Sequence, residues 1–224
     1  SNPERSKIKE SSETFTKEII HSNKNYETKK SFNVDTLINE IRIKFDYEDG
    51  GMLREPKFPM PSLWNSLLLH SQLFKDKEIY NHIIRTTDLI LSGGINDHLG
   101  GGISRYSVDK KWEIPHFEKM LYDNGLFLEL LSNIYKISKK NKYKRIIDLI
   151  INWLTREMRN NDGGFYSAVD AESEGEEGKF YSWDKKELIN ILKNELKYSS
   201  KEINLKNNFD DKIIITLSQK TDIL

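Results

Sequence analysis

The sequence predicts an all-α protein assembled from helical hairpins, and three observations support that prediction. Apolar residues recur at the spacing of amphipathic helices in several segments, and no strand-rich segment competes with them. The predicted helices come in pairs joined by short links, with long loops between the pairs. Three long loops carry a double glycine at or near their start: Gly50-Gly51, Gly93-Gly94 and Gly163-Gly164. We therefore expect a repeated hairpin that presents its long loops on one side.

The predicted helices follow one another along most of the chain. Ser62, Asp76 and Asp184 stand where helix N-caps are expected, because their side chains can accept hydrogen bonds from free backbone amides. The predicted helices are a weakly periodic piece from Phe15 to Tyr26, 34–46, a helix from Ser62, one from Asp76 to Gly93-Gly94, 117–138, 143–154 and one from Asp184 to about Leu196. The late segment DKIIITL fits either a strand or a helical turn. The predicted organisation is a polar lead-in (1–31), a helical-hairpin domain (32–200) and a poorly defined segment (201–224).

Charge and composition argue against several classes of function. The 224 residues include 35 basic and 35 acidic side chains, and the isoelectric point is about 7.0. Nucleic acid is therefore not expected as the main partner, because such proteins favour a basic face. Cysteine is absent, which excludes disulfides, thiolate metal sites and thiol nucleophiles within this sequence. No apolar run has the length of a bilayer span and no signal peptide is recognisable, so the expected location is the cytoplasm.

The richest segment in side chains that can bind a ligand or transfer a proton is 97–124, DHLGGGISRYSVDKKWEIPHFEKMLYDN, which spans a loop and a predicted helix start. Arg105 offers a forked donor for carboxylate, phosphate or vicinal hydroxyls, and Tyr106 and Trp112 offer flat faces suited to stacking on a sugar ring. His116 precedes the predicted helix and can act as an acid or base near neutral pH. Long ordered loops often have a functional role, so this one is a candidate site.

Two polar ridges are predicted on the helix that starts at Phe117. Glu118 and Tyr122 are four residues apart, as are Lys119 and Asp123, which fits the lip of a buried pocket. The alternative is that these groups only cap the helix, and that Lys119 and Asp123 form a weak surface pair. His70 and His82, which lie within predicted helices, are expected to be ordinary surface or core residues.

The third long loop, DAESEGEEGKFYSW, resembles the first half of a calcium-binding loop. Asp170, Glu172, Glu174 and Gly175 fit that pattern, but Tyr181 stands where a bidentate glutamate should close it. We therefore expect no metal, and no cofactor. The acids of this loop are expected to be solvated, or turned inward to hold hydroxyls or the Arg105 guanidinium.

The segments GGMLREPKFP, GGINDHLGGGISRYSVDKKWEIPHFEKMLYDN and DGGFYSAVDAESEGEEGKFYSW occur here in order. Together they resemble the spermatogenesis-associated protein 20-like family, also described as YyaL-like or thioredoxin-domain-containing proteins. The resemblance covers Val34 to Trp183, with a weaker continuation. It implies a partial (α/α)6 toroid, similar to N-acylglucosamine 2-epimerases, cellobiose epimerases and six-hairpin glycosidases.

Three departures from the family pattern limit what the resemblance implies. The thioredoxin-like module is missing, so its redox chemistry does not apply to a chain without cysteine. The predicted helices make about half of a toroid, so a homodimer that closes it, a fragment, or a degenerate product is expected. Finally, the small residues usual after the first double glycine are lost, and DAES replaces the more common DADS.

The resemblance implies a carbohydrate-active domain or its remnant, with a sugar-like small molecule as ligand. Neither nucleic acid nor a membrane is expected as a partner, because the charge is balanced and no apolar run is long enough to span a bilayer. An epimerase would use His98 and His116 on opposite faces of the substrate, and Glu118 or Asp123 would orient His116 or share its protons. A glycosidase would set Asp123 or Glu118 against Asp170. The remaining expected binding residues are Asp97, Arg105, Tyr106, Trp112, Glu172, Tyr181 and Trp183. A non-catalytic binding or assembly module is the alternative, because fold analogy alone does not establish activity.

Overall fold

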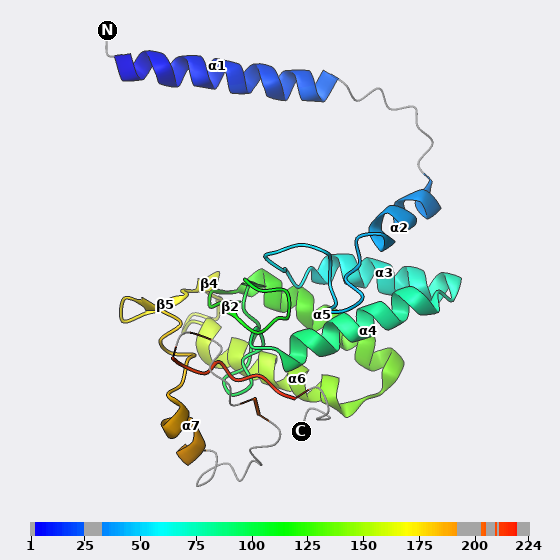
Figure 1. The fold of residues 1–224 in the computed structure, drawn as a ribbon, viewed down its shortest axis with the longest axis vertical. Helices are drawn as coiled ribbons and strands as arrows, with labels where there is room; N and C mark the ends of the chain where they lie inside the picture. The colour runs from blue at the N-terminus through cyan, green and yellow to red at the C-terminus, as the bar shows by residue number, and fades with distance from the viewer. Residues whose placement is uncertain (1–2, 25–32, 192–202, 205–208, 210, 219–224) are drawn as a thin grey trace. The chain divides into compact units, whose positions relative to one another are not determined.

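The computed structural model describes residues 3–24, 33–191, 203–204, 209 and 211–218 (Figure 1). The chain divides into two units, 1–40 and 41–224, and the boundary falls within one helix. In the first unit, α1 spans Pro3–Lys24, longer than the predicted helix from Phe15; the predicted end at Tyr26 lies outside the described residues. Helix α2 spans Val34–Arg42 and is capped by Asn33, whose Oδ1 accepts from the amides of Asp35 and Thr36.

Two helical hairpins build the second unit. Helix α3 (Pro61–Phe74) pairs with α4 (Lys77–Ser92), and α5 (Leu121–Ser138) pairs with α6 (Asn141–Trp153). Helix α3 also packs on α5, which joins the two hairpins (Figure 1). Their apolar stripes form a core of buried side chains that includes Trp64, Leu67, Ile83, Ile90, Phe127, Leu131, Ile134, Tyr143, Ile150 and Trp153. The mostly helical fold predicted from periodicity is confirmed.

Helix boundaries agree with the sequence at some positions and differ at others. Asp76 caps α4 as predicted, because its Oδ1 accepts from the amide of Ile79 at 3.1 Å. The start of the preceding helix was predicted at Ser62, but this helix, α3, begins at Pro61 behind Met60, whose backbone is left-handed. A short π-helical turn, η1 (Leu154–Met158), continues α6.

The long loops contain three short antiparallel ribbons, which periodicity did not predict. Each has two strands: β1 (Tyr106–Ser107) with β2 (Pro115–His116), β3 (Lys119–Met120) with β4 (Ala168–Val169), and β5 (Glu172–Ser173) with β6 (Glu176–Glu177). Residues 117–120 are therefore not the first turn of a helix. They are extended because Lys119 pairs with Val169, far along the chain.

The C-terminal part of the second unit is hydrogen-bonded to the end of the third loop. Helix α7 (Lys185–Ile191) begins after Asp184, whose Oδ1 accepts from the amides of Lys186 and Glu187, as the N-cap prediction requires. The predicted continuation of this helix to Leu196 lies in 192–202, outside the described residues. The segment DKIIITL includes extended backbone, because Ile213 exchanges hydrogen bonds with Trp183.

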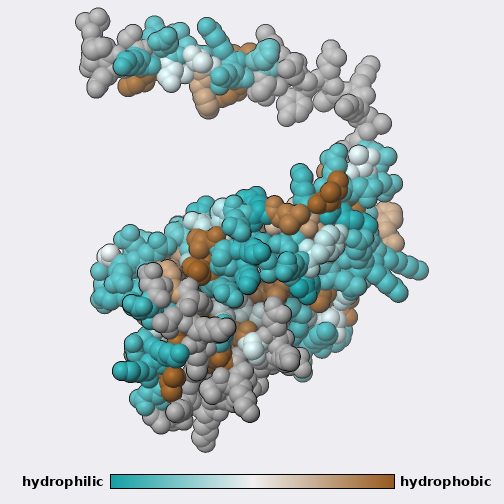
Figure 2. Space-filling model, in the orientation of Figure 1, coloured by the Kyte–Doolittle hydropathy of each residue, from teal (hydrophilic) through white to brown (hydrophobic). Residues whose placement is uncertain are grey.

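The visible surface of the second unit is mostly hydrophilic, with hydrophobic residues in small separate patches (Figure 2). Among the described helices, none combines the length and the apolar character needed to cross a bilayer.

Candidate functional site

The extended segment 115–120 has two different faces, and the candidate site is built around it. Side chains alternate across an extended backbone, so Pro115, Phe117 and Lys119 point to one side and His116 and Glu118 to the other. The first three are buried and line a cavity, whereas the last two are partly exposed. The predicted helix start, which placed Lys119 beside Asp123, was wrong because the period here is two rather than 3.6.

The side of His116 and Glu118 forms what we call the ionic face, together with Arg105, Asp123 and Glu177. The Nη1 of Arg105 lies 3.0 Å from Oε2 of Glu118, and Nε2 of His116 lies 3.8 Å from the same oxygen. The Nδ1 of His116 lies 2.8 Å from Oε1 of Glu177. Because a carboxylate only accepts hydrogen bonds, this contact places a proton on Nδ1 and leaves Nε2 of the neutral ring as the proton acceptor.

Asp123 supplies the second group that can exchange protons on this face. Burial raises the pKa of Asp123 to about 6, the nearby Glu118 carboxylate adds to the rise, and Arg105 opposes it. Near neutral pH, a fraction of Asp123 therefore carries a proton. The ionic face brings together an imidazole that can accept a proton and a carboxyl group that can donate one.

The other side of the segment faces a cavity of about 400 Å³. Four of the predicted binding or catalytic residues line it: Asp97, His98, Tyr181 and Trp183. Lys119 also lines the cavity, although it was not among the predicted catalytic or binding residues. Tyr181 stacks on Phe117, with ring centroids 5.7 Å apart, and its ring also lies 4.6 Å from the Lys119 Nζ.

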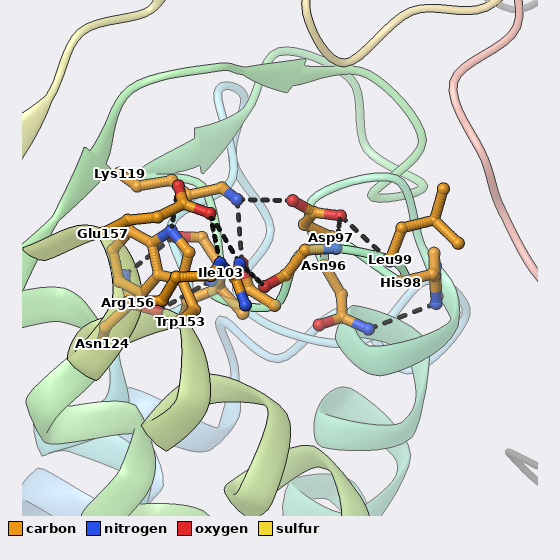
Figure 3. A network of polar contacts seen from close by, with 12 residues as sticks. Asn96, Asp97, His98, Leu99, Ile103, Lys119, Asn124, Trp153, Arg156 and Glu157 are labelled. Carbon is orange, nitrogen blue, oxygen red and sulfur yellow. Dashed lines mark hydrogen bonds and ion pairs between the residues drawn. The ribbon is translucent and has the colours of Figure 1, made fainter.

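Lys119 is only 1% exposed and is held by a polar network (Figure 3). Its Nζ lies 2.7 Å from Oδ2 of Asp97 and donates to the carbonyl of Gly101 at 2.9 Å. Burial lowers the pKa of Lys119, and Asp97 opposes that shift. Lys119 therefore forms a buried pair with Asp97, and the alternative of a weak surface pair with Asp123 is wrong. One signal in the sequence could have predicted that Lys119 is buried. It lies two residues from an apolar residue on either side, Phe117 and Leu121, and a spacing of two is the period of an extended segment.

His98 occupies a different position from the one an epimerase pair would need. Its Nε2 lies 2.9 Å from the Gly93 carbonyl and its Nδ1 lies 3.3 Å from Nδ2 of Asn96 (Figure 3). Both nitrogens are thereby bound to the protein, and burial lowers the pKa of His98. His98 lines the cavity, whereas His116 belongs to the ionic face, so the structure does not bring the two histidines to one wall.

The other predicted binding residues separate into core, stacked and solvent-exposed groups. Trp112 is fully buried, with its indole N–H donating to the Asp49 carbonyl at 2.8 Å, so the prediction that it stacks on a sugar is corrected. Tyr106 stacks on His116 at 4.8 Å and thereby orients that ring. Asp170 and Glu172 are exposed, and Asp170 accepts from the Glu172 amide at 3.1 Å. The described residues contain no group of three or more His, Asp or Glu side chains arranged to hold a metal ion.

Comparison with known proteins agrees with the family resemblance. No family model matches the chain. The chain is 38% identical over 158 residues to spermatogenesis-associated protein 20 of Mus musculus and 36% identical over 158 residues to that of Homo sapiens. The chain is a homologue of spermatogenesis-associated protein 20. The match covers 66% of this chain and 20% of the mouse protein, so the chain spans about a fifth of the length of these relatives.

Solved structures show which fold this part of the homologue adopts. The cellobiose 2-epimerase of Bacillus thermoamylovorans B4167 superposes with a TM-score of 0.51 at 15% identity, over 66% of this chain and 45% of that enzyme. A sugar epimerase from a ruminal bacterium superposes with a TM-score of 0.53 at 15% identity, over 60% of this chain and 37% of the enzyme. The predicted partial helical toroid is therefore confirmed as the fold.

Proposed function

We propose that the ionic face performs proton-transfer chemistry on a carbohydrate, in the manner of a sugar epimerase. The observation that supports this most is the meeting of His116 and Asp123 around Glu118 and Arg105. Asp123, with its pKa raised to about 6, can donate a proton near neutral pH, and the Nε2 of His116 can accept one, which together supply the acid and base of general acid–base catalysis. The fold shared with sugar epimerases gives the substrate class, as analogy only.

The proposed step uses both groups on one carbon. Nε2 of His116 removes the proton from the carbon next to the sugar carbonyl, forming an imidazolium and an enediolate. The guanidinium of Arg105 stabilises the negative oxygen of that intermediate. The carboxyl of Asp123 then delivers its own proton to the opposite face of the carbon and becomes a carboxylate. Exchange with water returns both groups to their starting states.

A glycosidase-like function is the second candidate, and one observation favours it. Two carboxylates with different environments can divide the roles of acid and base. Asp123 has its pKa raised to about 6, whereas Glu118 is ion-paired to Arg105. The pairing with Asp170 that the family resemblance suggested has less support, since Asp170 is exposed and bonded within its own loop.

The test is an incubation of the 224-residue chain with reducing mono- and disaccharides in D₂O, followed by proton NMR. An epimerase replaces the hydrogen next to the carbonyl with deuterium and yields the epimer without cleavage. A glycosidase instead releases new reducing ends. His116→Gln should reduce both deuterium incorporation and epimer formation by about 100-fold or more, because it removes the base, and Asp123→Asn should reduce epimer formation by a similar factor, because it removes the acid. The matched control Asp170→Asn should leave both unchanged.

Two results would contradict the proposal. In the first, the chain binds sugars in saturation-transfer NMR and yet shows no deuterium incorporation and no cleavage with any of them. That result would support the non-catalytic binding module instead. Equal activity in wild type and Asp123→Asn would remove Asp123 from the mechanism.

The partner expected for a half toroid is a second copy of the chain, and this remains a proposal. Helix α3 exposes Leu69, Leu73 and Phe74, each more than 60% accessible. Apolar side chains of this size gain by burial in an interface. Light scattering at several concentrations should show a dimer that Leu73→Asp weakens; a monomer at every concentration would contradict this.

A further inference from the structure

Two loops of the second unit are built in the same way. We call Asp46–Lys57 the first loop unit and Asp97–Lys119 the second loop unit. In the first, Nζ of Lys57 lies 2.7 Å from Oδ2 of Asp46 and 2.6 Å from the carbonyl of Gly50. In the second, Nζ of Lys119 lies 2.7 Å from Oδ2 of Asp97 and 2.9 Å from the carbonyl of Gly101. Both lysines are 1% exposed.

The backbone repeats with the side chains. The amide of Asp46 donates to the Gly51 carbonyl at 3.0 Å, and the amide of Asp97 donates to the Gly102 carbonyl at 3.0 Å. In both units Oδ1 of the aspartate accepts from the amides two and three residues later. The equivalent glycine pairs are therefore Gly50-Gly51 and Gly101-Gly102, all with positive φ, and not Gly93-Gly94 as the sequence suggested.

A tryptophan closes each unit at its second glycine. A Cβ on Gly51 would come within 2.8 Å of the Trp112 ring, and a Cβ on Gly102 within 2.8 Å of the Trp153 ring. The same rings lie beside the lysines, with Nζ of Lys57 5.5 Å from the Trp112 centroid and Nζ of Lys119 5.3 Å from the Trp153 centroid. Each ammonium is thus enclosed by a carboxylate, a carbonyl and an indole.

The second loop unit is bonded directly to the ionic face. Asn124, buried on α5 beside Asp123, accepts from the Ile103 amide at 2.8 Å and donates to the Ile103 carbonyl at 3.0 Å. The amide of Arg105 donates to the Glu118 carbonyl at 2.8 Å. The lysine of this unit therefore ties the extended segment to a loop that is itself bonded to the start of α5 (Figure 3).

The first loop unit reaches the neighbouring ribbon through its backbone. The amide and carbonyl of Lys57 exchange hydrogen bonds of 2.8 Å with Ser107 on β1. The side chain of Lys57 instead bonds within its own unit, to Asp46 and Gly50. We call the contacts of each lysine ammonium with its aspartate and its glycine carbonyl the lock of that unit. Replacing the Lys57 ammonium therefore breaks the lock of the first unit, but it leaves the backbone hydrogen bonds to β1 in place.

We propose that Lys119 is a positioning residue, which through Asp97 and Gly101 holds Glu118 and Asp123 in the arrangement that the ionic face requires. This inference rests on the proposed function, which gives the arrangement of Glu118 and Asp123 its use. The evidence for it is the geometry of the two loop units. Asp97, predicted to bind substrate, is in this account part of the lock. The side chain of Lys57 performs the same structural task within the first loop unit.

The test compares Lys119→Met with Lys57→Met in the 224-residue chain. Both changes remove a buried ammonium from the same kind of surroundings. Both variants should therefore lose a similar amount of stability, and a difference between them reports on the ionic face. The readout is the titration of the Asp123 carboxyl carbon by ¹³C NMR, with Asp123→Asn to assign the signal. Lys119→Met should move the midpoint from about 6 towards the ordinary value of 3.8, because a loosened loop admits water and releases Glu118. Lys57→Met should leave it at about 6.

Equal midpoints in the two variants, moved or unmoved, would overturn the proposal. Should Lys119→Met fail to fold, Asp97→Asn and Asp46→Asn provide the same comparison, because each keeps the shape of the side chain and weakens the ion pair. A midpoint that moves in Asp97→Asn alone supports the proposal, and one that stays in place in both overturns it. Since the readout is a titration and not turnover, inactivity on sugars would refute the proposed function without affecting this result.

Discussion

The two loop units share one lock but differ in what surrounds it. Beside Lys57, the neighbours at one and three positions before the lysine are Pro56 and Arg54. Beside Lys119, the same positions hold Glu118 and His116, the central residues of the ionic face. The contacts that recur in both units are thus explained by the need to hold each loop in shape. The residues that differ are the ones to which chemistry should be assigned.

The largest expected effect comes from breaking either lock. Lys57→Met and Lys119→Met should each lower the free energy of unfolding by about 3–5 kcal/mol, because each leaves a largely buried carboxylate without its partner. Urea unfolding followed by circular dichroism measures this cost. A cost below about 1 kcal/mol, typical of surface pairs, would mean that the buried geometry is wrong.

The lock also has a pH dependence that can be checked on Asp46. Burial acts to raise the pKa of Asp46, but Lys57 and two backbone amides outweigh it and hold the pKa below 3.8. The unfolded chain therefore binds this proton first, and the contribution of Asp46 is present above pH 3.8 and lost as the pH falls through the lower folded value. Asp46→Asn should flatten the acid limb of the stability curve, whereas an unchanged limb would contradict this assignment.

The second effect concerns the glycines that make room for the tryptophans. Gly102→Ala combines a left-handed backbone with a Cβ that meets Trp153, so its cost should be about 2–5 kcal/mol. Gly163→Ala is the matched control, because Gly163 has φ of 86° and no heavy atom of the described residues lies within 4 Å of the position that a Cβ would occupy. Its cost should be about 1–2 kcal/mol. Thermal unfolding that shows equal costs would contradict close packing at Trp153.

The smallest effect comes from one histidine near each unit. Nε2 of His82 lies 3.0 Å from the Gly51 carbonyl, and His98 makes the equivalent type of contact with Gly93. Burial lowers the pKa of both, so the unfolded chain binds protons first and stability falls as the pH drops below about 6.5. Each histidine should contribute at most about 1.4 kcal/mol per pH unit. His82→Gln and His98→Gln should each reduce the slope, measured by urea unfolding between about pH 5 and 7; a slope unchanged in both would contradict this.

The sequence was sufficient for features that depend on local contacts. The helical hairpins follow from apolar periodicity, and Asp76 and Asp184 cap their helices through amides only two or three residues away. The family resemblance likewise rested on contiguous motifs. Of the candidate site, Arg105, His116, Glu118 and Asp123 were identified and are brought together.

Features that depend on distant partners were missed for a physical reason. Phe117, Met120 and Leu121 have helical spacing, but the pairing of Lys119 with Val169 keeps this stretch extended. The burial of that lysine depends on an aspartate 22 positions away in sequence, and the position of the Trp112 ring depends on the space at a glycine in another loop. The acid that reaches His116 comes from the third loop, and no spacing in the sequence indicates which of its acids does so.

The most direct test of the account is the ¹³C titration of the Asp123 carboxyl in the wild-type chain. The proposed proton transfer requires this group to donate a proton near neutral pH beside His116. It predicts a midpoint at about 6, raised by burial and by Glu118. A midpoint near 3.8 would mean that Asp123 is ionised throughout the working range, and the ionic face would then lack its proton donor.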